Sequence, residues 1–129
     1  MLRRTADVAF AWEIADGRRA GLELLADAEP PTAVLASSAE LALGFMSAAA
    51  ARGARVPDDV ALVAFDDPYF GDLLEPSLTA VAYDPRVVGA TAADLLVEAM
   101  RSGVERREVR VPVSLVRRRS CGCQPEVSP

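Results

Sequence analysis

Residues 60–67 read VALVAFDD, six apolar residues followed by two aspartates. A short run that is apolar at every position is typical of a parallel strand with both faces covered, and the turn-forming residues 57–59 mark where it begins. In an open parallel sheet, ligands bind beyond the carboxyl ends of the strands. The two aspartates, Asp66 and Asp67, are therefore the first residues to consider for a binding site.

Further strand and helix patterns alternate on both sides of this stretch. The apolar run 32–36 predicts a second buried strand, residues 78–82 a short one, and the period-two pattern of 109–116 an edge strand containing Pro112. A short first strand is expected at 7–11. This order predicts an α/β fold with a mainly parallel sheet flanked by helices on both faces.

Capping signals place three helices between these strands. Asp16 is a candidate cap for a helix that ends at Pro30-Pro31. Ser37 and Glu40 fit a capping box for a second helix, which Gly53 ends. The third helix begins at Asp84-Pro85, where Pro tolerates the first turn, and Gly103 ends it.

Composition limits the function classes. The chain of 129 residues is long enough for one compact domain, and its net charge of −5 argues against a nucleic-acid surface. All 14 basic residues are Arg, so the Lys and His side chains on which much acid-base, Schiff-base and metal chemistry depends are missing. We therefore expect neither an enzyme nor a cofactor.

The sequence also lacks features of export, membrane insertion and metal binding. Residues 1–4 are basic, but Asp7 and Glu13 interrupt any signal peptide, and no run approaches the roughly 18 apolar residues of a membrane helix. A cytoplasmic protein without a membrane partner is expected. Cys121 and Cys123 lack further metal ligands, so residues 121–129 are predicted to be a flexible tail without a metal site.

Polar and aromatic side chains follow the predicted strands at their carboxyl ends. An indole, a phenol, hydroxyls and carboxylates at one sheet edge would suit a carbohydrate-like ligand. Each residue also has a structural interpretation: a serine or Asp84 as a helix cap, Asp66 in a turn with Pro68, an aromatic side chain in the core. The candidate residues are Trp12, Ser37-Ser38, Asp66-Asp67 and Tyr83-Asp84.

Two enzyme-like alternatives fail on the residues present. A phospho-accepting receiver domain would use paired acidic residues with magnesium, but it also needs a Lys, and the chain has none. A serine hydrolase built on Ser37 or Ser38 would lack a His base and the G-x-S-x-G turn.

Several segments in consecutive order carry a family resemblance. They are Pro31–Ala36, Leu41–Gly44, Arg52-Gly53, Val56–Val60, Val63–Asp67, Pro76–Val81 and the ending Arg119–Cys121. Together the segments resemble the core of the lactose-repressor/galactose-repressor family of transcription factors over about residues 10–121. The resemblance implies one lobe of a periplasmic-binding-protein-like fold, in which two lobes close on an effector and change operator affinity through a helix-turn-helix head.

The resemblance also implies roles for individual residues. Asp66 matches an effector-contacting Asp, Trp12 an aromatic that stacks on the effector, and Tyr83 a polar contact at a strand end. Ser38 stands where the family usually has an effector-binding Asn, and Ala39 where it has Asp, so the preferred ligand is open. The family dimerises through this lobe, which implies interface residues on the second helix and the following loop; the alternative is that they fill the core. These residues are Phe45, Met46, Tyr69, Phe70 and Leu73.

Two functions remain as hypotheses. In the first, residues 1–120 are the C-terminal lobe of a transcriptional regulator that binds a sugar-like small molecule and forms a homodimer. It contacts DNA only through a DNA-binding head, and both this head and the N-terminal lobe are absent from this chain. The alternative is a stand-alone small-molecule binding or dimerisation module without DNA activity. A solute-binding protein for transport is third, because such proteins need an export signal.

Overall fold

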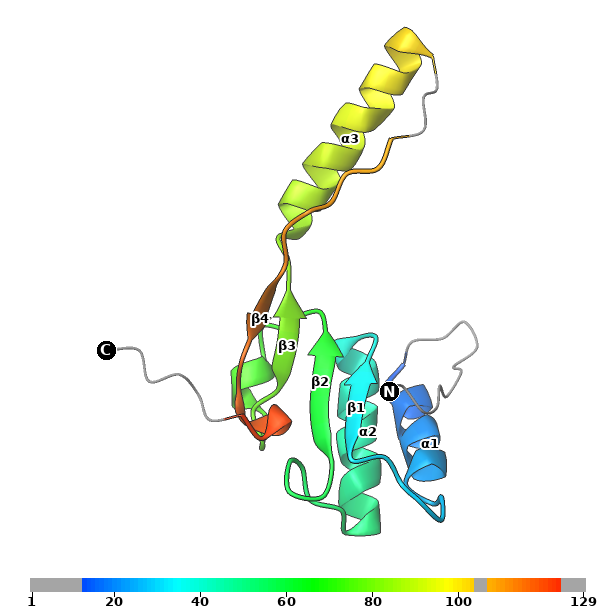
Figure 1. The fold of residues 1–129 in the computed structure, drawn as a ribbon, viewed down its shortest axis with the longest axis vertical. Helices are drawn as coiled ribbons and strands as arrows, with labels where there is room; N and C mark the ends of the chain where they lie inside the picture. The colour runs from blue at the N-terminus through cyan, green and yellow to red at the C-terminus, as the bar shows by residue number, and fades with distance from the viewer. Residues whose placement is uncertain (1–12, 104–106, 124–129) are drawn as a thin grey trace, which may run out of the picture.

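The computed structural model describes residues 13–103 and 107–123, which form one four-stranded sheet with helices (Figure 1). The strands lie in the order β1-β2-β3-β4; the first two pairs are parallel and β4 is antiparallel to β3. The predicted mainly parallel α/β fold is confirmed. The strands are β1 (Ala33–Ala36), β2 (Ala61–Phe65), β3 (Thr79–Ala82) and β4 (Ser114–Val116); the helices are α1 (Ile14–Leu24), α2 (Ala39–Arg52) and α3 (Pro85–Ser102), with 3₁₀ turns η1 (Gly71–Leu73) and η2 (Arg119–Cys121).

The helix starts follow the capping signals with two shifts. Ser38, not Ser37, caps α2, since its Oγ accepts from the backbone N–H of Leu41 at 3.2 Å. Helix α1 begins at Ile14, so Asp16 lies inside its first turn and accepts from the backbone N–H of Glu13. Serine and aspartate can serve at neighbouring positions of a helix start, and the sequence pattern leaves such one- to three-residue shifts open.

The predicted ends of α2 and α3 are confirmed, whereas α1 ends at Leu24, ahead of the Pro30-Pro31 that the sequence marks as its end. Proline prevents a helix from continuing but does not make it reach that point. Gly53 ends α2 in the left-handed conformation, with φ 68°, which a residue without a Cβ adopts at no steric cost. Asp84 caps α3 by accepting from the backbone N–H of Arg86 at 2.8 Å, Pro85 opens the helix, and Gly103 follows its end.

Helices α1 and α2 pack with their backbones in contact. A Cβ added to Gly17 would lie 2.3 Å from the carbonyl oxygen of Leu41, and one added to Gly44 would lie 2.1 Å from that of Ile14. Only glycine fits at these two positions. The contact fixes α1 against α2, and α2 in turn covers one face of the sheet.

The core lies between that face and α2. Leu62, Ala64 and Ala80 of the sheet pack there with Leu41 and Phe45 of the helix, all buried. This face of β2 carries the alternate residues of the apolar run, as a strand with a period of two requires.

The opposite face of the sheet is apolar and open to solvent. Leu35 pairs with Val63, Phe65 with Val81, and Val81 with Leu115, so these residues share one face. Leu35 is 66% exposed and Leu115 is 52% exposed. Within residues 13–103 and 107–123, no helix covers this second face, so the prediction of helices on both faces is wrong for the described part of the chain. The strands are nevertheless apolar on both faces, as in a sheet that has a layer of helices on each side.

Helix α3 forms an arm that points away from the sheet (Figure 1). None of its residues with a described side chain is buried, and Leu96, Val97 and Met100 are exposed apolar residues. The chain then returns along the helix, where Arg107 forms an ion pair with Glu98. Only 114–116 of the predicted strand 109–116 pairs with the sheet, because the preceding residues follow the arm, where the described chain offers no partner strand.

Candidate functional site

Asp66 lies directly after β2, at the carboxyl end of the central parallel strands. Its backbone has φ 72°, in the left-handed region that is uncommon for residues other than glycine and most accessible to Asn and Asp. Backbone strain of this kind collects at functional sites, where the surrounding structure holds a side chain in a required direction. The position agrees with the end-of-strand rule that singled out Asp66 in the sequence.

Tyr83 follows β3 and meets Asp66 at this edge. A hydrogen bond with the Asp66 carboxylate, together with its negative charge, raises the pKa of the Tyr83 phenol. The ring of Tyr83 also lies against that of Phe65, with centroids 5.9 Å apart and planes tilted by 32°. The structure therefore brings two of the predicted site residues, Asp66 and Tyr83, together at this edge.

A hollow of about 250 Å³ begins at Tyr83. Ala82, Tyr83 and Asp84 line one side, where the chain leaves β3 for the arm, and Pro112 to Ser114 line the other, where it returns to β4. The carboxylate–phenol pair thus stands beside a concave surface at the root of the arm.

The remaining site predictions have different outcomes. Ser38 follows β1 at the same edge, but it is buried and its Oγ caps α2, which favours its structural role. Trp12 and the predicted strand 7–11 lie outside the described residues. Asp84 caps α3, which is the structural interpretation that the sequence gives for it.

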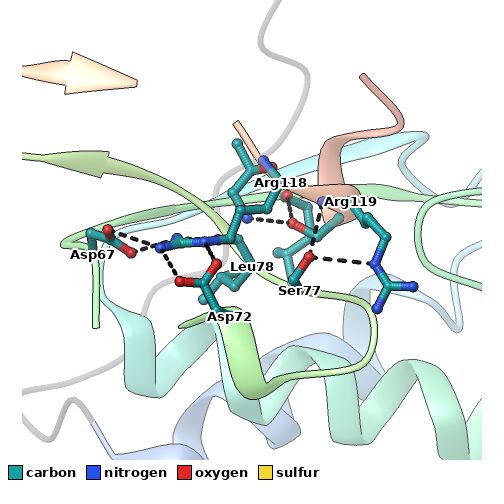
Figure 2. Close-up of polar contacts among 9 residues, drawn as sticks. Asp67, Asp72, Ser77, Leu78, Arg118 and Arg119 are labelled. Atoms are coloured by element: carbon teal, nitrogen blue, oxygen red, sulfur yellow. Dashed lines mark hydrogen bonds and ion pairs between the residues drawn. The ribbon is translucent and has the colours of Figure 1, made fainter. Parts of the chain in front are cut away.

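Asp67 points to a different partner. The Arg118 guanidinium donates to both Asp67 oxygens, at 2.6 and 3.2 Å, and to the backbone carbonyl of Leu78 at 2.8 Å (Figure 2). It also binds Asp72 of η1, and these two carboxylates raise the pKa of Arg118. Asp67 thus has a structural role, because Arg118 holds the loop 67–78 to the chain that follows β4.

Sequence reasoning missed Arg118. Its signal was weak, because Arg117, Arg118 and Arg119 stand in a row and the sequence does not show which one faces inward. In the structure the side chain of Arg118 is 11% exposed, whereas that of Arg119 is 54% exposed and binds Glu75.

Ser120 completes this attachment. Its Oγ donates to the carbonyl of Leu62 at 2.7 Å and accepts from the backbone N–H of Thr79 at 2.8 Å. Ser120 is fully buried, so η2 is fixed against β2 and β3. Cys121, predicted to begin a flexible tail, is instead the last residue of η2 and is half-buried. Residues 124–129 lie outside the described residues.

The predicted dimer residues divide by exposure. Phe45 fills the core and Met46 packs against it, which is the alternative weighed for them. Tyr69 is 96% exposed and Leu73 is 83% exposed, while Phe70 is half-buried and packs edge-on against Tyr69. An exposed apolar surface thus remains on the loop 67–78.

The geometry is that of a ligand-binding α/β domain: polar side chains gather at the carboxyl ends of parallel strands, beside a concave surface. Residues 3–121 match the model of the periplasmic binding protein-like domain, and the chain belongs to that family.

Similar proteins agree with this assignment. The lactose operon repressor of Escherichia coli strain K12 is 31% identical over 109 residues, which is 84% of this chain and 30% of the repressor. The structure of the lac repressor dimer bound to operator and the anti-inducer ONPF is 31% identical, with a TM-score of 0.75 over 84% of this chain and 38% of that one. A regulator of the lactose-repressor family from Lactobacillus casei with bound sucrose is 28% identical, with a TM-score of 0.66 over 84% of this chain and 40% of that one.

Four further observations bear on function. The chain spans 30% of the length of the curated lactose operon repressor. Its relatives are transcriptional repressors and not enzymes. Among the described residues, no helix is long and apolar enough to cross a membrane, and no three potential metal ligands lie close together.

Proposed function

We propose that this chain is the ligand-sensing and dimerising part of a bacterial transcriptional regulator, that it binds a sugar-like effector, and that effector binding changes operator affinity through a DNA-binding head outside these 129 residues. The observation that carries this proposal is the Asp66–Tyr83 pair. It places a charged acceptor and a phenol at the sheet edge where ligands of such folds bind.

A sugar-like effector suits this pair chemically. A carboxylate accepts two hydrogen bonds from adjacent hydroxyls, and the faces of aromatic rings pack on sugar C–H groups. Phe65, which is 42% exposed, and Tyr83 supply such rings beside Asp66. The sucrose-bound relative supports the same ligand class.

The uncovered surfaces support a larger protein. The open face of the sheet and the exposed apolar residues of the arm would be costly to leave in water, at about 25 cal/mol for each Å² of apolar surface. Parts of the regulator outside this chain would cover the open sheet face and the arm. The chain spans only 30% of the lactose operon repressor and 38% of the lac repressor structure, so the rest of such a protein is large enough to do so. In this arrangement the sheet belongs to the C-terminal lobe and the arm reaches the N-terminal lobe.

Dimerisation rests on the loop 67–78. Tyr69 and Leu73 expose apolar side chains there, and the Arg118 contacts hold the loop in a fixed shape. A rigid apolar patch presents its side chains without an ordering cost, which favours an interface with a second copy.

The test is calorimetric titration of the intact regulator with sucrose and glucose, comparing Asp66→Asn with the unaltered protein. Asn keeps the left-handed backbone and removes the charge. A charged hydrogen bond is worth about 1.5–3 kcal/mol, so affinity should fall roughly 10- to 150-fold. Asp58→Asn, an exposed carboxylate before β2, should leave affinity unchanged. Equal affinity of Asp66→Asn and the unaltered protein would contradict the proposed contact, and no binding of either sugar would contradict the ligand class.

A further inference from the structure

The segment Cys121-Gly122-Cys123 has no part in the proposed effector site, yet it is held in a defined position. Ser120, directly before it, is buried and bonded to both β2 and β3. Gly122 takes φ 70°, and this left-handed turn folds Cys123 back toward Cys121. A Cβ at Gly122 would meet Pro57 only at ordinary contact distance, 3.5 Å, so glycine is required here by the backbone and not by space.

The turn brings the two thiols into one hydrogen-bonded group. The backbone N–H of Cys123 donates to the sulfur of Cys121 at 3.2 Å, and the Cys123 thiol donates to the backbone carbonyl of Cys121 at 3.8 Å. The Cys121 thiol in turn lies 3.4 Å from the carbonyl oxygen of Arg118. Both cysteines are free, Cys121 partly accessible and Cys123 exposed.

The surroundings of the two sulfurs differ in a way that sets their reactivity. Burial opposes ionisation of the Cys121 thiol, but hydrogen bonds from Cys123 and Thr79 outweigh it and lower its pKa. The pKa of the Cys123 thiol is raised, first by a hydrogen bond to Cys121, then by burial and by the charge of the neighbouring sulfur. The thiolate, which is the nucleophile in thiol chemistry, is therefore favoured on Cys121 over Cys123, and the backbone N–H of Cys123 is placed to stabilise it.

We propose that Cys121 and Cys123 form a thiol–disulfide exchange site, in which Cys121 is the attacking thiol and Cys123 the resolving thiol, and that the co-reactant is a low-molecular-weight disulfide. An accessible thiolate next to a second thiol is the arrangement that such reactions need. Metal binding is less well supported, because no third ligand lies near the pair within the described residues.

The reaction balances in two steps. The Cys121 thiolate attacks one sulfur of the small disulfide, the S–S bond breaks, and one small thiolate leaves. Cys123 then loses its proton, its thiolate attacks the sulfur of Cys121, and the second small thiolate leaves. The two cysteines are oxidised to an intramolecular disulfide, and the small disulfide gains the two electrons as two thiols.

The test uses the full chain, reduced and then incubated at neutral pH with glutathione disulfide, with intact-mass measurement over time. The unaltered protein should lose two hydrogens and keep no glutathione. Cys123→Ser should accumulate one glutathione adduct on Cys121, because the resolving thiol is gone and the serine hydroxyl can still donate to the thiolate. Cys121→Ser should react roughly 10-fold more slowly than Cys123→Ser, since it removes the thiol whose sulfur accepts the stabilising backbone N–H.

Three results would overturn the proposal: a stable glutathione adduct on the unaltered protein, a disulfide-linked dimer in place of the intramolecular bond, or equal reaction rates of the two serine variants. Far-UV circular dichroism of each variant shows that the fold is kept. The proposal does not depend on the effector. A failed sugar titration would leave the thiol proposal unaffected, and a failed thiol experiment would leave the proposed effector site unaffected.

Discussion

The contacts of Arg118 predict that its ion pair with Asp67 stabilises the fold more than its ion pair with Asp72. Arg118→Met keeps an unbranched side chain and removes the charge, which leaves Asp67 without its partner. The Asp67 side chain is 21% exposed and accepts two hydrogen bonds, whereas that of Asp72 is 75% exposed. Breaking a buried ion pair costs about 3–5 kcal/mol, and partial solvent access reduces this, so we expect Arg118→Met to lose about 2–4 kcal/mol of unfolding free energy.

Double-mutant cycles with Asp67→Asn and Asp72→Asn separate the two carboxylates. The Arg118–Asp67 coupling should be about 1.5–3 kcal/mol, as for a charged hydrogen bond with limited solvent access, and the Arg118–Asp72 coupling about 0.2–1 kcal/mol, as for an exposed pair. Urea unfolding followed by far-UV circular dichroism measures each free energy. A coupling to Asp72 equal to or larger than that to Asp67 would refute the argument from exposure.

Two further predictions concern the same region. Ser120→Ala should lower the unfolding free energy by about 2–4 kcal/mol in the same urea assay, because it leaves the buried N–H of Thr79 without an acceptor and removes a donor to the carbonyl of Leu62. The control Ser114→Ala, on the exposed edge strand, should change the unfolding free energy by no more than about 0.5 kcal/mol. A similar loss in both variants would disprove the role of Ser120. Leu73→Arg should weaken dimerisation of the intact regulator by at least about 10-fold in sedimentation velocity, since it places a charge in the proposed apolar interface, whereas dimers of unchanged affinity would remove the loop from the interface.

The parallel part of the fold could be predicted because its signals are local. The runs 32–36 and 60–65 are apolar at every position, and Gly53, Asp84 and Pro85 mark helix ends through their own backbone preferences. The end-of-strand rule then placed Asp66 and Tyr83 at one edge, although they are 17 positions apart.

The parts that the sequence did not predict depend on distant partners. Residues 109–113 alternate as a strand should, but a strand needs a neighbour, and the described chain provides one only from Ser114 onward. Arg118 is one of three consecutive arginines, and only the fold shows that it faces Asp67. The helical pattern of residues 85–102 likewise does not show that α3 points away from the sheet (Figure 1).

The left-handed backbone of Asp66 restricts how this site can change during evolution. At φ 72° the steric penalty is large for a β-branched or bulky residue, smaller for Asp and Asn, and absent for Gly. Position 66 therefore tolerates few residue types, and among Asp, Asn and Gly only Asp carries a negative charge. New ligand preferences would arise more readily at Tyr83, whose backbone follows an ordinary strand, so that ligand specificity diversifies around a nearly fixed carboxylate.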